Sequence, residues 1–511
     1  MIKIYTQATH LKVEYDEGTP KEIAKSEEIL KTKFQARDAS MAMNPLVKKG
    51  LLSDVKSFYN EEFKILPCGF LPFLEKYYEK EKLKYTIFDA RTFPNVNKEF
   101  LKEFMAGKIK FGTEDPRGYQ IEAVYAAVKN RGGIIQLPTA SGKTLVMSAI
   151  MKAYPCKMLV FFNTIDLIEQ TYEKMLKYGF KASEVGVIQG SNFDDTKRIT
   201  LLSVQSYEKA YNLFTEVKAI ICDEVHETGR TDVPEKIIYS CQNAPLHIGL
   251  SATPWSDNDY ETMRLYGNIG PVIYKKEFKE QMDAEHLAKT EVEIYKYDAE
   301  PIRPTGNWSD FYETVKVSQT NPEEKLIKEG FTIKTEKGKR VGKKFLDYGD
   351  EYTHIVNNEK RNKKIIEVIK KYVAQKKRIL VIYSRIDHGD ILKKMYPKAV
   401  LIHGKHDSEE RSKAAKKLRV EEATVVLASV IWKKGIDIEE IDVFINATGG
   451  KGSVNVIQKL GRVVRKSRTT DKQVAIAVDF DDTDISGIGR RQTEKRLHSY
   501  QKRLNLPVRF L

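Results

Sequence analysis

A short polar loop between an apolar segment and a helical segment carries the residues best suited to bind phosphate. The loop reads Pro138-Thr139-Ala140-Ser141-Gly142-Lys143-Thr144, and it follows the apolar run Gly133–Leu137. Backbone amides of such a loop, and of the helix that it opens, can face anionic oxygens. Lys143 would then reach the β and γ phosphates of a nucleotide, and the Thr144 hydroxyl would complete a Mg²⁺ shell.

The loop departs from the strict G-x-x-x-x-G-K-[ST] pattern at two positions. Leu137 stands where the first glycine belongs, and Ala140 stands where related loops often have glycine. The alternative interpretation is a plain strand, turn and helix with a capping hydroxyl. The loop favours phosphate binding, and its detailed phosphate geometry stays open.

Two adjacent acids follow the next suitable apolar run. The run Ala219–Cys222 ends in Asp223 and Glu224. In nucleotide hydrolysis one acid can hold Mg²⁺ while a neighbouring acid activates water. Asp223 suits the metal, and Glu224 suits the base. A strand ending in a solvated acidic turn is the alternative, which is common for an isolated pair but not beside a phosphate loop.

Further motifs follow in a fixed order along the chain. They are Ser251-Ala252-Thr253-Pro254, the group Ser429, Gly435, Ile436 and Asp437, and Gln458-Lys459-Leu460-Gly461-Arg462-Val463-Val464-Arg465. Together with the phosphate loop and the box Asp223-Glu224-Val225-His226, they resemble the motifs of superfamily 2 helicases and translocases. The set spans residues 117–465, and chance agreement in this order is negligible.

The resemblance implies a motor that hydrolyses ATP and uses Mg²⁺. The catalytic residues that it implies are Lys143, Asp223, Glu224, Gln458, Arg462 and Arg465, with Thr144 and Asp223 as metal ligands. Arg462 and Arg465 are three apart and so share one face of a helix. They would complete the site when two domains close on ATP. A solvated basic helix face is the alternative for them.

The same resemblance extends the cofactor site and adds residues that couple it to motion. It implies that Gln120 reads the adenine edge with Arg117 close by, and that Gly435 and Asp437 also bind the cofactor. His226, Ser251 and Thr253 would couple hydrolysis to domain motion. A local turn before Pro254 is the alternative for the last two.

Polar residues after the apolar runs are candidates to contact nucleic-acid phosphates. They are Asn163, Thr164, Ser203, Gln205, Ser206, Ser384, Arg385, His403, Gly404, Lys405 and Ser429. Each could instead be a helix cap. Their recurrence at the ends of predicted parallel strands, where binding sites gather, supports a nucleic-acid track.

Within the superfamily, two segments narrow the resemblance. Leu66-Pro67-Cys68-Gly69-Phe70-Leu71 and Asn358-Glu359-Lys360-Arg361-Asn362 resemble UvsW-type phage helicases. That resemblance implies remodelling of branched or forked DNA in phage recombination, repair and replication: branch migration, fork regression and R-loop unwinding. It also implies RNA–DNA hybrids and recombination or single-strand-binding proteins as partners. A restriction-type or excision-repair-type duplex translocase, an RNA helicase and a non-catalytic ATP switch are the alternatives.

Alternating apolar and helical segments indicate the elements that position these residues. The apolar runs are Gly133–Leu137, Met158–Phe162, Ile199–Val204, Ala219–Asp223 and His247–Ser251, then Ile379–Tyr383, Ala399–His403, Thr424–Ala428, Val443–Asn446 and Val474–Asp479. Such alternation is typical of parallel sheets covered on both faces. The fold class is therefore α/β, with two tandem RecA-like domains after a small α+β domain.

The predicted domain boundaries follow this pattern. We expect an accessory, DNA-binding domain over 1–110, a RecA-like ATP-binding domain over 111–290, a linker over 291–355, a second RecA-like domain over 356–486 and a basic tail over 487–511. The segment 331–344 has strand-like flanks around a glycine turn and could form a basic hairpin. The tail would contact DNA or pack as a helix on the second domain.

Charge and composition limit the function classes. The 511 residues include 86 Lys and Arg against 71 Asp and Glu, a net charge of +15 that suits a polyanionic partner. No apolar run approaches the roughly 18–20 residues of a membrane helix, so no membrane partner is expected. No signal peptide is evident. Four scattered cysteines form no C-x-x-C pair, which fits a reducing cytoplasm, here that of an infected host cell.

Overall fold

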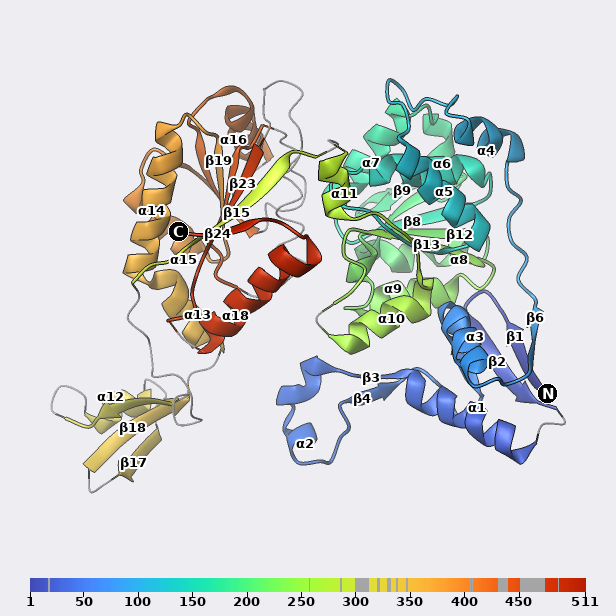
Figure 1. Cartoon of the computed structure of the whole chain (residues 1–511), viewed down its shortest axis with the longest axis horizontal. Coiled ribbons are helices and arrows are strands. Elements are labelled where there is room, and N and C mark those ends of the chain that lie inside the picture. The colour runs from blue at the N-terminus through green and yellow to red at the C-terminus, as the bar shows by residue number, and fades with distance from the viewer. Residues whose placement is uncertain are drawn as a thin grey trace. The chain divides into compact units, whose positions relative to one another are not determined.

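In the computed structural model, the chain forms two compact units, Met1–Gln281 and Met282–Leu511 (Figure 1). The structure describes all residues except 17–18, 257, 285–286, 299–311, 319–321, 329–331, 337–338, 346–347, 405, 407, 431–439, 451–473 and 486. The first unit holds a small N-terminal sheet and one large sheet, and the second unit holds another large sheet.

The N-terminal region is built on a four-stranded sheet in the order β5-β2-β1-β6. Its strands are β1 (Ile2–Thr6), β2 (His10–Tyr15), β5 (Ile65–Pro67) and β6 (Tyr85–Asp89). Alternate residues such as Ile4 and Leu11 are fully buried in a core shared with the helices α1 (Pro20–Lys33) and α3 (Leu71–Lys80). This alternation is typical of a sheet that is covered on one face. The predicted small α+β domain is confirmed.

Two further parts complete the N-terminal region. A short hairpin of β3 (Gln35–Arg37) and β4 (Val55–Ser57) carries α2 (Pro45–Lys48) between its strands. The helix α4 (Lys98–Met105) then leads into the large sheet, where its Phe104 is fully buried in the core.

The first large sheet has eight strands in the order β10-β9-β11-β8-β12-β13-β7-β14. They are β7 (Gly133–Gln136), β8 (Met158–Phe162), β9 (Val185–Gln189), β10 (Asn192–Phe193), β11 (Ile199–Ser203), β12 (Ala219–Asp223), β13 (Leu246–Ser251) and β14 (Val272–Lys275). All neighbouring pairs are parallel except β9 with β10. The carboxyl ends of these parallel strands therefore meet at one edge.

Helices cover both faces of this sheet (Figure 1). One layer is α5 (Gly118–Asn130), α6 (Lys143–Ala153) and α7 (Ile165–Lys177); the other is α8 (Tyr211–Phe214), α9 (Asp232–Ser240) and α10 (Asp259–Ile269), with α11 (Phe278–Asp283) after β14. Ile135 and Val160 enter the core of the first layer, whereas Ile134 and Leu159 enter that of the second. Adjacent residues of one strand are thus buried on opposite faces, which explains the continuous apolar runs.

The second large sheet has seven parallel strands in the order β20-β21-β19-β22-β23-β15-β24. They are β15 (Lys289–Tyr295), β19 (Ile379–Tyr383), β20 (Val400–Ile402), β21 (Val425–Ser429), β22 (Val443–Asn446), β23 (Val474–Phe480) and β24 (Val508–Phe510). The described helices of this unit are α12 (Glu323–Lys328), α13 (Tyr348–Asn357), α14 (Glu359–Ala374), α15 (Ile386–Met395), α16 (Ser408–Val420) and α18 (Gly487–His498). The predicted pair of parallel-sheet domains is confirmed.

This sheet draws on more of the chain than the segment 356–486. The strand β15 crosses the predicted boundary at 290/291 and pairs with β23, and β24 comes from the predicted tail and pairs with β15. The strand β15 alternates charged and apolar residues and β24 has only three residues, so neither gives the apolar run by which the other strands are recognised.

The helix α18 is packed into the second unit by a buried charge network. Arg496 of α18 donates through Nε to Asp479 at 3.0 Å and through Nη2 to Asp482 at 3.0 Å. Arg361 of α14 donates through Nε to the same Asp482 at 2.8 Å. Because Arg361 and Arg496 are almost fully buried, this part of the predicted basic tail supports the domain through Arg496.

The basic segment 331–344 forms the hairpin that the sequence suggests. The strands β17 (Thr332–Glu336) and β18 (Lys339–Phe345) are antiparallel, and β16 (Tyr312–Lys316) pairs with the other side of β18. Its role in gripping or separating strands stays a prediction.

Among the described residues, no helix has both the length and the apolar character needed to cross a membrane. In the same part of the chain, no cluster of three His, Cys, Asp or Glu side chains is placed to hold a metal ion. A metal at the predicted site would therefore rely on phosphate oxygens or water as well as on protein ligands.

Candidate active site

The phosphate loop lies between the end of β7 and the start of α6, at the carboxyl edge of the first large sheet. The Leu137 amide donates to the Ser251 carbonyl at 3.0 Å, so the loop leaves the sheet in register with β13. The Leu137 side chain is fully buried in the core. An apolar residue at the usual glycine position thus serves packing, and the loop begins after it.

Gly142 ends the loop in close contact with α5. A Cβ atom at this position would lie 2.3 Å from Gln120 Nε2, and the φ angle of Gly142 is +78°, so glycine is required. Gln120 Nε2 and Tyr119 Oη both donate to the Ser141 carbonyl, at 2.9 and 2.7 Å. The Arg117 amide donates to Gln120 Oε1 at 2.8 Å. Gln120 thus braces the loop, and adenine recognition by Gln120 and Arg117 stays a prediction.

The rest of the loop is fixed by its own hydrogen bonds. The Ser141 hydroxyl donates to the Pro138 carbonyl at 2.6 Å. Ala140 has a left-handed backbone with φ of +69°, a conformation that costs a residue with a Cβ atom about 1 kcal/mol. Thr139 and Ala140 precede the first turn of α6, whose amides have no acceptors within the helix. This arrangement leaves amide donors facing the place where phosphate is predicted.

Lys143 and the two predicted acids come together at this edge. Lys143 Nζ donates to Glu224 Oε1 at 3.0 Å, and the Glu224 amide donates to Asp223 Oδ1 at 3.0 Å. Asp223 ends β12, and Glu224 follows with a left-handed φ of +50°. Strained residues of this kind gather at functional sites. The structure therefore joins the cation of the loop to the predicted catalytic base.

The charges at the site suit ATP with Mg²⁺. Burial and the negative charge of Glu224 raise the pKa of Asp223 above its ordinary value, so its carboxylate lacks full compensation by positive charge. A divalent cation beside Asp223 and the Thr144 hydroxyl would supply it. For Glu224, burial acts to raise the pKa, but the positive charges of Lys143 and His226 prevail and lower it. Glu224 is thus held as a carboxylate, which a proton acceptor requires.

The predicted coupling residues form a connected chain of contacts behind Glu224. His226 Nδ1 lies 3.4 Å from Glu224 Oε2 and shares a hydrogen bond with Ser251 Oγ at 3.0 Å. The Thr253 amide in turn donates to Ser251 Oγ at 3.0 Å. His226, Ser251 and Thr253 are buried. The three residues therefore connect the acid pair on β12 to the segment that leaves β13.

The ends of β8 and β11 bring the first predicted nucleic-acid residues together. The two strands run in register, so Asn163 and Thr164 after β8 lie at the same edge as Ser203 and the turn after it. Asn163 Nδ2 and Thr164 Oγ1 are buried atoms without a hydrogen-bond partner among the described residues. Gln205 is exposed, whereas the Ser206 hydroxyl accepts a backbone amide of the neighbouring loop at 3.2 Å.

The second unit brings its own predicted contact residues to one edge. Ser384 and Arg385 follow β19, His403 and Gly404 follow β20, and Ser429 ends β21. These strands are parallel and in register. Arg385 Nη1 donates to a threonine hydroxyl of α13 at 2.6 Å, and Ser429 Oγ is buried without a partner in the described part of the chain.

Several predicted site residues lie outside the described residues. They are Lys405, Gly435, Asp437, Gln458, Arg462 and Arg465. Their roles therefore stay predictions.

Two family models match the chain in the order of its motifs. The model described as "Type III restriction enzyme, res subunit" matches residues 113–256, and the "Helicase conserved C-terminal domain" matches residues 360–467. The first match contains the phosphate loop, the acid pair and the coupling residues. The second match contains Ser429 and the motif with Arg462 and Arg465.

Named relatives match most of the chain. The DNA 3'-5' translocase XPB2 of Sulfurisphaera tokodaii is 28% identical over 434 residues, covering 83% of this chain and 90% of the relative. The ATP-dependent DNA helicase uvsW of Enterobacteria phage T4 is 24% identical over 465 residues, covering 87% and 80%. The chain is an ATP-dependent superfamily 2 helicase of the UvsW-like type.

A solved structure supports the fold of this helicase. The ATP-dependent Type ISP restriction-modification enzyme LlaBIII, bound to DNA, has a TM-score of 0.52 and 14% identity, and the match covers 79% of the helicase and 32% of that chain. At this identity the likeness bears on the fold alone, and it agrees with the two RecA-like domains.

Sequence reasoning missed two polar residues that hold the flanks of the helicase site. Tyr119 braces the loop beside Gln120, and its position next to the predicted glutamine was the available signal. Asn258 caps α10, which follows the Ser251–Thr253 segment, and its Nδ2 donates to Asp38 Oδ1 at 2.9 Å. An asparagine before a helix indicates a cap, but its distant partner in the N-terminal region left no local signal.

Proposed function

We propose that this helicase couples ATP hydrolysis to the remodelling of branched or forked DNA, including junction branch migration, fork regression and R-loop unwinding. The similarity to the phage T4 uvsW helicase over 87% of this chain supports the proposal. The net charge of +15 suits a nucleic-acid partner. The N-terminal region would act as a DNA-binding accessory domain in this scheme.

The residues of the phosphate loop and of β12 would divide the chemistry between them. Lys143 and the loop amides would bind the phosphates, while Thr144 and Asp223 would hold Mg²⁺, whose charge makes the γ-phosphate easier to attack. Lys143 would then leave Glu224 for the phosphate oxygens. Glu224, freed from this ion pair, would accept the proton of the attacking water.

One observation carries the proposal that this chemistry drives motion. Glu224 contacts Lys143 on one side and His226 on the other, and His226 shares a hydrogen bond with Ser251. A change in the Lys143–Glu224 pair would therefore alter the contacts of His226. The effect would pass to Ser251 and Thr253 and then to the helix α10 that follows them.

The experiment offers forks, four-way junctions, R-loops, blunt duplex DNA and duplex RNA in parallel, with ATP. We expect DNA-stimulated ATP hydrolysis and ATP-dependent remodelling of the branched DNA. Glu224→Gln should abolish both, whereas Glu169→Gln makes the same change at an exposed position of α7 and should preserve them. Absence of stimulated hydrolysis in the wild type would refute the motor, and a preference for duplex RNA would refute the DNA substrate.

A duplex DNA translocase is the second candidate. It is favoured by the XPB2 relative, which carries that name and is matched over 90% of its length. A translocase would displace a third strand from a triplex without separating the duplex beneath it. Triplex displacement without branch migration would select this candidate.

A further inference from the structure

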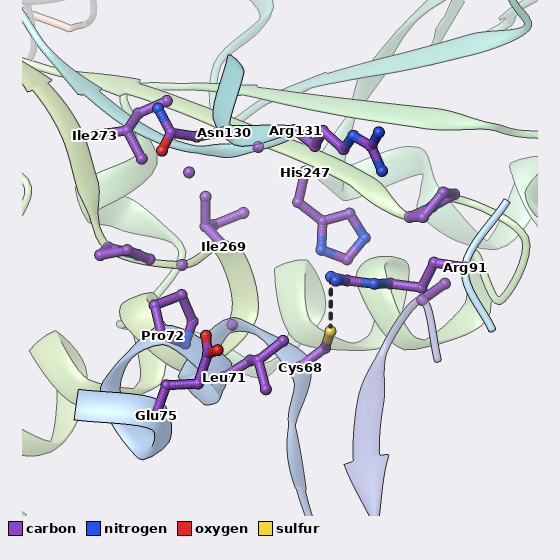
Figure 2. Close-up of a pocket in the computed structure, with 17 residues that line it drawn as sticks. Cys68, Leu71, Pro72, Glu75, Arg91, Asn130, Arg131, His247, Ile269 and Ile273 are labelled. Carbon is purple, nitrogen blue, oxygen red and sulfur yellow. Dashed lines mark hydrogen bonds between the residues drawn. The ribbon is translucent and has the colours of Figure 1, made fainter. Parts of the chain in front are cut away.

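A cavity of about 290 Å³ lies between the N-terminal region and the first large sheet, and Figure 2 shows its lining. Cys68, Glu75 and Arg91 line it from the N-terminal region, and Arg131 and His247 line it from the other side. Gly133 at the start of β7 also lines it, so the cavity borders the amino edge of the sheet, opposite the phosphate loop. It is therefore distinct from the predicted ATP site.

His247 presents an unused acceptor to this cavity. Its Nδ1 donates to the Asn268 carbonyl at 3.0 Å, and burial lowers the pKa of His247 to about 4, so the ring is neutral at physiological pH. Nε2 then carries a lone pair, and it has no hydrogen-bond partner in the described part of the chain. His247 is only 6% exposed. Because an unsatisfied buried polar atom costs about 1–3 kcal/mol, the site favours an occupant that donates a hydrogen bond.

Arg131 supplies a cation beside that acceptor. Its guanidinium and that of Arg91 lie over the same Phe93 ring, 5.1 and 5.0 Å from its centroid. Asp89 accepts two hydrogen bonds from Arg91, both at 2.8 Å. Within the described residues, no carboxylate lies within ion-pair distance of Arg131. Arg91 is thus neutralised by its partner, whereas the donors of Arg131 are open to a ligand.

The backbone at Arg131 is held in an unusual conformation. Arg131 ends α5 with a left-handed φ of +54°, where glycine is the usual residue. Gly132 follows in contact with β13, because a Cβ atom there would lie 2.8 Å from the His247 carbonyl. The fold therefore fixes the start of the Arg131 side chain next to His247. An arginine at a glycine position is strained, and such strain points to a use for its side chain.

The remaining walls restrict the chemical class of the occupant. Leu71, Ile269 and Ile273 give apolar surface, and Glu75 adds a second acceptor (Figure 2). A simple anion would meet Glu75 and the apolar walls, and an apolar ligand would leave His247 and Arg131 unpaired. A flat heteroaromatic group with adjacent donors and acceptors suits both the apolar walls and the polar groups, and arginine planes stack on such rings.

We propose that this cavity binds a nucleobase, with His247 Nε2 accepting from a ring or exocyclic N–H and Arg131 donating to a neighbouring base oxygen or nitrogen. The base could belong to a free nucleoside or to an unpaired strand at a DNA branch. The second source rests on the proposed function, whereas binding of the free nucleoside does not.

The first arm of the test titrates the full chain with adenosine, guanosine, cytidine and thymidine by calorimetry, with ADP and Mg²⁺ present in excess to fill the ATP site. We expect saturable binding of at least one nucleoside. Arg131→Gly should weaken it by about tenfold or more, the effect of losing one charge-assisted hydrogen bond. Because glycine suits the left-handed backbone, the melting temperature of this variant should not fall.

The control for this arm is Lys129→Ala, which removes a cation from an exposed position two residues away on α5. It should leave nucleoside binding unchanged. Absence of binding by all four nucleosides, or equal binding by the wild type and Arg131→Gly, would overturn the proposal.

The second arm distinguishes the two sources of the base. Forked DNA carries the fluorescent base 2-aminopurine in an unpaired arm or in the duplex. A fluorescence change confined to the unpaired arm, and lost in Arg131→Gly, identifies the DNA strand as the source. Nucleoside binding without that change identifies a free nucleoside. Nucleoside binding by a chain that hydrolyses no ATP on DNA would uphold the cavity while refuting the proposed motor.

Discussion

Two charged clusters occupy comparable places, each at the carboxyl end of a strand in its own parallel sheet. In the first unit, Lys143 meets Asp223 and Glu224 at the end of β12. In the second unit, Arg361 and Arg496 meet Asp479 and Asp482 at the end of β23, the arginines contacting both acids between them. The two clusters use the same charges but differ in how completely those charges are paired.

The degree of pairing separates a structural cluster from a reactive one. Asp482 accepts from Tyr297 at 2.6 Å as well as from both arginines, and Asp479 accepts from Tyr500 at 2.7 Å. By contrast, the Glu224 side chain is 26% exposed, and Asp223 keeps a raised pKa. A fully paired buried cluster holds elements together, whereas an incompletely paired one is ready to bind a ligand.

The largest expected effect concerns the charge that the first cluster lacks. Arg465→Ala should retain ATP binding and lower the rate of DNA-stimulated hydrolysis by about 10³–10⁵-fold, because the resemblance implies that Arg465 stabilises charge on the transferred phosphoryl group. The measurements are nucleotide affinity and steady-state turnover. Arg491→Ala, at an exposed position of α18, should change neither. Unchanged turnover in Arg465→Ala would contradict this role.

One isosteric change made in both clusters tests the comparison directly. Glu224→Gln should lower turnover by about 10²–10⁴-fold, the usual contribution of a general base. Its free energy of unfolding should stay near that of the wild type, because the Glu224 side chain is partly exposed. Asp482→Asn should lower that free energy by about 3–5 kcal/mol, because Arg361 and Arg496 would lose a buried counter-charge.

Urea unfolding and ATP turnover, measured on both variants, give the outcome. The exposed change Asp484→Asn, close to Asp482 in the chain, is the control for stability and should have little effect. If Glu224→Gln unfolds more easily than Asp482→Asn, the division into a reactive and a structural cluster is wrong.

These clusters also show what the sequence could predict. Lys143, Asp223 and Glu224 were predictable because they stand at fixed places after apolar strands, and the chemistry of phosphate restricts which residues can stand there. Arg496 was counted with a basic tail because its partners lie in β23 and the loop after it, far from it in the sequence beyond a local pattern. Likewise, β15 and β24 join the second sheet through pairing with distant strands, which their short sequences do not reveal.

Acid should weaken the structural cluster. Burial acts to raise the pKa of Asp482, but the positive charges of Arg361 and Arg496 prevail and hold it below its ordinary value. Tyr297 and Thr493 also face Asp482, and Asp479 shares Arg496 with it. A lowered folded-state pKa contributes stability above the unfolded-state pKa, and this is lost as pH falls through the folded value.

The measurement is the free energy of unfolding of the wild type and Asp482→Asn from neutral pH down to below pH 4. We expect the wild type to lose more stability on acidification, by about 1.4 kcal/mol for each unit by which the Asp482 pKa is lowered. Parallel curves for the two proteins would show that Asp482 carries no such contribution.

The smallest expected effect compares two alanines with left-handed backbones. Ala140 in the phosphate loop has φ of +69°, and Ala423 before β21 has φ of +57°. Glycine relieves the strain at either position but adds freedom to the unfolded chain, so Ala140→Gly and Ala423→Gly should each change stability by about 1 kcal/mol or less. Ala140→Gly should also alter the Michaelis constant for ATP, because its amide lies in the predicted phosphate cradle, whereas Ala423→Gly should leave it unchanged. Equal kinetic effects of the two substitutions would mean that the Ala140 backbone has no special part in binding phosphate.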